Sequence, residues 1–164
     1  MSTSVLRSQP PGPGRRKRAG FTLIEILAVM AIIGMLLAIV APRLQALLKT
    51  VRVTQAIGDI NAIEMDVIAF SSLRDSLPAS LEAIGWGGKL DPWGRPYQYL
   101  AFDPTDRNPA GARKDRSLTP LNSDFDLYSL GEDGASVAPI TARASQDDII
   151  RANDGGFVGL ARLY

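Results

Sequence analysis

The stretch FTLIEILAVMAIIGMLLAIV, residues 21–40, decides the fold because it is apolar enough to form a membrane-spanning helix. Within it Glu25 is the only charged side chain and Thr22 the only other distinctly polar one. A helix of this length rises about 30 Å, which is the thickness of the hydrocarbon core of a bilayer. Four basic residues, 15–18, precede the run. The positive-inside rule predicts that these residues stay in the cytoplasm and that the C-terminal body crosses the membrane.

Glu25 is an unexpected residue in this run, because an unpaired carboxylate in a bilayer or a helix bundle costs several kcal/mol. A plain signal-anchor helix leaves Glu25 unexplained unless its side chain reaches the membrane edge. An ordinary signal peptide has a shorter apolar core followed by a small-residue cleavage site, whereas the small pair Ala19-Gly20 precedes the core here. Glu25 therefore needs a partner that the apolar run does not supply.

The composition limits the possible functions. The chain has 164 residues and contains neither Cys nor His, which excludes thiol nucleophiles, Cys/His zinc sites, Ser-His-Asp triads and disulfides. The first twenty residues hold five of the 18 basic side chains and no acid, so the rest has 13 basic against 17 acidic side chains. A mildly acidic body argues against nucleic-acid binding. Without a nucleophile paired to a base or a phosphate-binding glycine loop, we predict a structural protein and not an enzyme.

A second helical pattern follows the apolar run. Pro42 removes a helical hydrogen bond and kinks or loosens the helix. Beyond it, apolar residues recur at helical spacing, while charged residues, Glu64 among them, occupy the other faces. The pattern predicts one helix from about Phe21 to Phe70, with an amphipathic second half that needs a surface to pack on. The apolar set comprises Leu44, Leu47, Leu48, Val51, Ile57, Ile60, Ile63, Val67 and Ile68.

The rest of the chain is predicted to supply that surface as a small sheet. Residues 97–102 (YQYLAF) and 124–130 (DFDLYSL) are rich in residues that favour strands. The segment between them, 103–120, has three prolines and many charges and reads as a solvated loop. Little regular structure is expected for residues 135–144, and residues 147–164 are expected to form a tail. The predicted fold class is α+β, with a long N-terminal helix packed on a small C-terminal antiparallel β-sheet that carries long loops.

The N-terminal residues GFTLIEILAVMAIIGMLLAIVAP, 20–42, resemble over their whole length the N-terminus of type IV pilins and of type II secretion pseudopilins. This resemblance implies that a prepilin peptidase cuts after Gly20 and methylates the new amine of Phe21. It also implies that Glu25 pairs with the N-terminal amine of a neighbouring subunit as a filament assembles. Such a pair forms only when one subunit is displaced axially against the next, so it would set the register of the filament.

Motifs in the C-terminal body are similar to one subgroup, the major pseudopilins of type II secretion systems. They are LDPWGRPYQY (90–99), DLYSLGEDG (126–134) and DDI (147–149). The tail RANDGGFVGLARLY, 151–164, extends past the usual ending of that subgroup. The departure leaves open a related subunit of another pilin-like machine.

The resemblance implies a major structural subunit that polymerises through its N-terminal helix to drive protein export across the outer membrane. The alternative is a subunit of a type IV pilus or another pilin-like filament. A third possibility is a membrane-anchored binding module that never polymerises, and in such a protein Glu25 would be dispensable. Expected partners are further copies of the chain, the prepilin peptidase, minor pseudopilins, the inner-membrane assembly platform and the membrane. The expected segments are a leader (1–20), a transmembrane and filament-core helix (21–42) and a periplasmic globular domain (43–164), with a single pass through the inner membrane.

The resemblance further implies a calcium ion that holds the C-terminal loops together. Carried over by position, the ligands would be the carbonyl of Leu130, the carboxylate of Asp133, and the carboxylates of one or both of Asp147 and Asp148. Calcium takes six to eight oxygen ligands with little demand on geometry, which suits acids on separate loops. A weaker rival site is the pair Asp124 and Asp126, whose alternate positions on a strand share a face.

Overall fold

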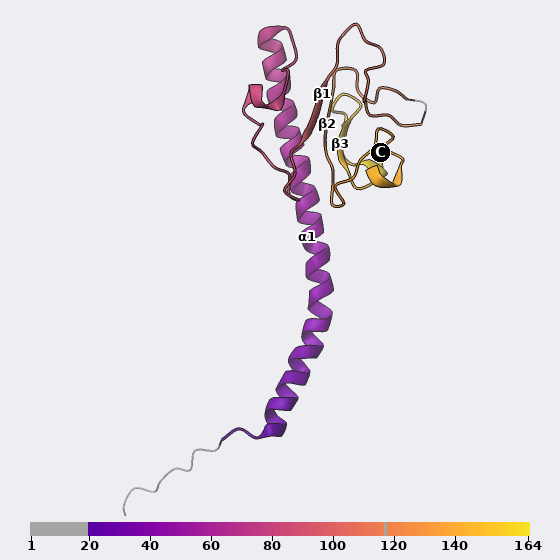
Figure 1. Cartoon of the computed structure of the whole chain (residues 1–164). Coiled ribbons are helices and arrows are strands. Elements are labelled where there is room, and N and C mark those ends of the chain that lie inside the picture. Colours follow the sequence, from indigo (N-terminus) through magenta and orange to yellow (C-terminus); the bar gives the residue numbers. More distant parts are fainter. Residues whose placement is uncertain (1–19, 117) are drawn as a thin grey trace, which may run out of the picture. The chain divides into compact units, whose positions relative to one another are not determined.

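The computed structural model describes residues 20–116 and 118–164 (Figure 1). The leader expected at 1–20 lies outside the described residues except for Gly20. The chain divides into two compact units, Met1–Pro42 and Arg43–Tyr164, and each is described by itself. The long helix α1 spans Leu23–Arg74 and contains Pro42 in its interior. One uninterrupted helix is therefore confirmed, and it ends at Arg74 and not at Phe70.

The first unit contributes the apolar part of α1. Every described residue from Gly20 to Pro42 is exposed, including all the large apolar side chains of the run. Among the described residues, α1 is the one helix long and apolar enough to cross a membrane. Apolar surface of this extent is unfavourable in water, so this part of the helix needs lipid or other helices around it.

In the second unit, the rest of α1 packs on an antiparallel sheet through a narrow stripe. Ala56, Ile60, Ile63 and Val67 are fully buried and recur at intervals of three and four residues, which places them on one helical face. Against the prediction, Glu64 is also buried on this side of the helix. Only part of the expected apolar set is therefore buried. The members that stay exposed are Leu44, Leu47, Leu48, Val51 and Ile68.

The sheet has four strands in the order β1-β2-β3-β4, and every neighbouring pair is antiparallel. The strands are β1 (Gln98–Ala101), β2 (Phe125–Ser129), β3 (Ile149–Ala152) and β4 (Phe157–Leu160). Three short 3-10 turns accompany them, at Leu81–Ile84, Arg143–Ser145 and Ala161–Leu163. The α+β class, with a long helix on a small antiparallel sheet, is confirmed.

Side chains alternate along a strand, so neighbouring residues point to opposite faces of the sheet. Both faces of this sheet are covered by packed side chains. Ile149 of β3 packs with the helix stripe, Phe125 and Leu127, whereas its neighbour Ile150 points into a second cluster on the other side. The second cluster also contains Leu121, Ile140, Ala152 and Ala161. The loops that the sequence left without regular structure therefore form the outer layer of the sheet.

The C-terminal tail is part of this sheet. The turn between β3 and β4 places Asn153, Asp154 and Gly155 at positive φ, a conformation that Asn, Asp and Gly adopt most readily. Residues beyond Ile149 thus build half of the sheet's strands, a role that the sequence had not assigned to them. The ring of Tyr164 packs edge-on against the ring of Phe157, and the two ring centres lie 5.2 Å apart.

Candidate functional site

The N-terminus of α1 is capped by its own sequence. The N–H of Glu25 donates to the hydroxyl oxygen of Thr22 at 3.3 Å and to the Thr22 carbonyl at 3.2 Å. Thr22 followed three residues later by Glu25 has the spacing of a capping box, in which the first side chain satisfies a free N–H of the first turn. The helix therefore begins directly after the proposed cleavage position.

The residues expected to act in processing and assembly all lie at this exposed end. Gly20 and Glu25 are exposed, and Phe21 has 81% of its surface exposed. Within residues 20–116 and 118–164, Glu25 makes no salt bridge. Its carboxylate is therefore available to a partner outside this part of the chain.

The two C-terminal motifs that are separated in sequence lie against each other. Asp91 accepts hydrogen bonds from the amides of Trp93 and Arg95 and from the hydroxyl of Ser129. The Arg95 guanidinium donates to the carbonyl of Gly131 at 2.8 Å. DPWGRP is thus a turn held by one aspartate, and its arginine fixes the start of the GEDG turn.

Two of the predicted calcium ligands meet beside that turn. The carboxylate of Asp147 accepts the N–H of Asp133 at 2.9 Å, and the carboxylate of Asp133 accepts the N–H of Ala135. Gly131 has φ +64°, and a Cβ there would collide with the backbone carbonyl of Asp147. The carbonyl of Leu130 accepts the N–H of Gly134 at 3.2 Å. Carboxylates and carbonyls are oxygen ligands of the kind that calcium takes in proteins.

Asp148 lies apart from these two. Its Oδ2 accepts hydrogen bonds from the guanidinium of Arg113 and the hydroxyl of Ser136, and both charged side chains are almost completely buried. Burial raises the pKa of Asp148 to about 6, although the hydrogen bond from Ser136 and the charge of Arg113 act in the opposite direction. Among the described residues, no three acidic side chains gather around a common point that could hold a metal.

The rival pair is occupied by protein partners. Asp126 is buried and accepts hydrogen bonds from the Arg113 amide at 2.6 Å and the Asn122 side chain at 2.9 Å. Burial raises the pKa of Asp126, and these two bonds oppose that effect. Asp124 instead binds the guanidinium of Arg151 through both carboxylate oxygens. The two acids therefore serve different partners and form no joint site.

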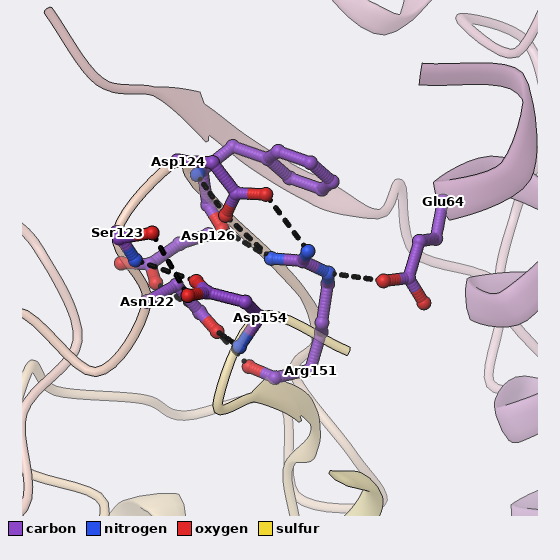
Figure 2. A network of polar contacts seen from close by, with 8 residues as sticks. Glu64, Asn122, Ser123, Asp124, Asp126, Arg151 and Asp154 are labelled. Carbon is purple, nitrogen blue, oxygen red and sulfur yellow. Dashed lines mark hydrogen bonds and ion pairs between the residues drawn. The ribbon is translucent and has the colours of Figure 1, made fainter. Parts of the chain in front are cut away.

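A buried arginine that the sequence had not pointed to connects the helix with the sheet. Figure 2 shows Arg151 of β3 between Glu64 of α1 and Asp124. The Nε of Arg151 lies 2.7 Å from Glu64 Oε1, and its Nη1 lies 2.7 Å from Asp124 Oδ1. Its guanidinium also donates to the Phe125 carbonyl and lies 3.9 Å from the centre of the Phe125 ring. Burial alone would lower the pKa of Arg151, but the hydrogen bonds and charges of Asp124 and Glu64 outweigh it and raise the pKa.

One sequence signal could have suggested this contact. Glu64 is an acid in the apolar helix stripe and Arg151 a base in the apolar strand IIRA, and each needs an opposite charge when it is buried. Gly155 completes the fit, because a Cβ there would collide with the Glu64 carboxylate.

Comparison with known proteins agrees with these features. Residues 15–41 match the family model of the prokaryotic N-terminal methylation motif. The type II secretion system core protein G of Pseudomonas aeruginosa is 38% identical, and the match covers 73% of this chain and 87% of that protein. The proteins of the same name from Vibrio cholerae and Escherichia coli are 30% and 29% identical, over 73% and 81% of this chain and 84% and 90% of their own lengths. No solved structure matches the chain significantly. The chain therefore belongs to the family of the type II secretion system core protein G, the major pseudopilins.

Proposed function

We propose that this pseudopilin is anchored in the inner membrane by residues 21–40, carries residues 43–164 in the periplasm, and polymerises with further copies of itself to drive protein export across the outer membrane. The observation that carries this proposal is the apolar run 21–40, where every residue is exposed and Glu25 is the only charge. Such a helix is stable in lipid before assembly and among identical helices after it. The relatives are named as secretion system proteins, which does not favour the alternative of a type IV pilus.

In this proposal, Glu25 sets the axial register of the filament. Cleavage after Gly20 by a prepilin peptidase frees the amine of Phe21, which is four residues from Glu25 along the chain. The rise between these two residues is about 6 Å in a helix, so the amine and the carboxylate of neighbouring subunits meet only at one axial offset. Burial between helices strengthens the attraction and penalises every other register.

Replacement of Glu25 by Ala tests this role. We expect the variant to enter the membrane as the parent does, because its helix becomes more apolar, and to form few or no filaments. The measurement is filament yield by electron microscopy in a host with the complete secretion machinery, together with the amount of protein in the membrane fraction. Asp106→Ala, in an exposed loop, is the control that should assemble normally. A normal filament yield for Glu25→Ala would sink the register proposal.

The processing step is tested separately. In a host with a prepilin peptidase, the intact mass should correspond to a chain that begins at N-methylated Phe21. In the same host without the peptidase, the chain should retain its first twenty residues. An uncut chain in both hosts would contradict the proposed maturation after Gly20. The minor pseudopilins and the inner-membrane assembly platform are the further partners proposed for the mature chain.

We also propose a calcium ion at the GEDG turn, held by the carboxylates of Asp133 and Asp147 and a carbonyl of the turn, with Leu130 the carbonyl carried over by resemblance. A bound cation would neutralise these two acids and link two ends of a long loop. Calcium should raise the melting temperature of the full chain in detergent, and Asp133→Ala should remove that increase. Asp106→Ala is again the matched control. A parent protein that melts at the same temperature with calcium and with a chelator would remove the ion from the proposal.

A further inference from the structure

Arg113 is a buried cation in the loop that the sequence left as solvated. Its side chain is 2% exposed, and its guanidinium lies 4.4 Å from the centre of the Tyr128 ring. One terminal nitrogen donates to the Ser136 hydroxyl and to the Val137 carbonyl, and the other donates to Asp148. Arg113 therefore contacts both ends of the segment 136–148, which runs from the GEDG turn to β3.

The backbone around Arg113 fixes the position of this cation. Its N–H donates to the buried carboxylate of Asp126 on β2, and its carbonyl accepts the N–H of Leu121. The next residue, Lys114, exchanges backbone hydrogen bonds with Ala138 and Ile140. The guanidinium is thus held on the sheet by several independent contacts, and the segment 136–148 is attached to it.

We infer that Arg113 supplies the positive charge for Asp148, so that Asp148 belongs to an internal ion pair and is not a ligand of calcium. The resemblance assigns Asp133 and one or both of Asp147 and Asp148 to the metal. Here Asp148 is fully buried and its Oδ2 is occupied by two donors, whereas Asp133 and Asp147 meet beside the exposed turn. The Arg113 guanidinium therefore neutralises Asp148 at one end of the loop, as a bound cation would do there.

The pair also has a physical weakness that makes it testable. Within the described part of the chain, the Nε of Arg113 and the Oδ1 of Asp148 are buried without a hydrogen-bond partner. Removing one member of a buried pair leaves the other charge uncompensated, whereas removing both charges is often nearly neutral. Single variants should therefore be much less stable than the parent, and the double variant should recover much of the loss.

The experiment is a double-mutant cycle on the full chain in detergent, with Arg113→Met, Asp148→Asn and the combination. Both tryptophans, Trp86 and Trp93, lie in the second unit, so their fluorescence reports the melting of that unit alone. We expect each single variant to melt about 10 °C lower, from the usual cost of an unpaired buried charge and the usual shift of melting temperature per unit of free energy. The double variant should recover much of that loss and melt at a higher temperature than either single variant. The control variant Arg107→Met, at an exposed position of the same loop, should leave the melting temperature unchanged.

A calcium titration of the same proteins completes the test. Asp148→Asn should keep whatever calcium-induced shift the parent has, and Asp147→Asn should lose it; this arm rests on the calcium proposal above. If the parent has no shift, calcium binding fails while the double-mutant cycle still decides the role of Arg113. Additive losses in the cycle, or loss of a parental calcium shift in Asp148→Asn, would overturn the inference.

Discussion

The buried contact between Arg151, Glu64 and Asp124 permits a quantitative prediction. Replacement of Arg151 by Met keeps most of the side-chain volume and removes the guanidinium. Glu64 then loses its partner at 2.7 Å while its side chain is only 12% exposed, and Asp124 loses a two-oxygen contact at 35% exposure. Breaking a buried ion pair in this way costs about 3–5 kcal/mol, and most of that cost falls on Glu64 because Asp124 can be hydrated. We expect Arg151→Met to lower the free energy of unfolding by that amount.

The assay is urea unfolding of the full chain in detergent, followed by tryptophan fluorescence. Glu64→Gln should cost less than Arg151→Met, because the amide oxygen can still accept the hydrogen bond from Arg151. The matched control is Lys49→Met, which breaks an exposed pair with Glu132 and should cost less than about 1 kcal/mol. If Arg151→Met were as stable as Lys49→Met, the reasoning that this network joins helix and sheet would be refuted.

Three further predictions concern the second unit. Burial raises the pKa of Tyr99 to about 12 from its ordinary value of 10.0. Above pH 10 the unfolded chain therefore releases a proton that the folded chain keeps, so the free energy of unfolding falls as pH rises. Tyr99→Phe should make this fall less steep in unfolding measured at alkaline pH, and an unchanged slope would contradict the prediction. Gly131→Ala should lower the free energy of unfolding by about 1–3 kcal/mol, because φ is positive there and the new Cβ would meet the Asp147 carbonyl. Gly58→Ala, in open space on α1, should instead raise the free energy of unfolding by about 0.5–1 kcal/mol. Equal effects of the two variants in urea unfolding would refute this contrast. Deletion of residues 157–164 should abolish cooperative unfolding, because it removes β4 from β3; a cooperative transition at the parent's midpoint would show the tail to be dispensable.

The long helix and the first two strands could be predicted because they depend on local patterns. The apolar run 21–40 and the helical spacing after Pro42 predicted one helix, and strand-forming residues predicted β1 and β2. The strands β3 and β4 were missed for a physical reason. IIRA and FVGL are too short to show a clear period, and β3 is buried on both faces, so no alternation of polar and apolar residues marks it.

The candidate site was only partly predictable. The backbone N–H of Asp133 donates to the Asp147 carboxylate beside the GEDG turn, and Gly20, Phe21 and Glu25 are exposed near the start of α1. The position of Asp148 could not be predicted, since its partner Arg113 is 35 residues away in a segment that reads as a solvated loop. Charge and proline content describe such a loop correctly on average, but they do not reveal which of its arginines turns inward.

The long helix, the single acid in its apolar run 21–40 and the family of the chain follow from the sequence alone, because they depend on the order of residues along a single segment. Only the tertiary structure decided which buried charges neutralise each other. Arg151 meets Glu64 across 87 residues of sequence, and Arg113 meets Asp148 across 35. A buried charge requires a partner but does not specify which one, and the choice is made when the helix and the loops close over the two faces of the sheet.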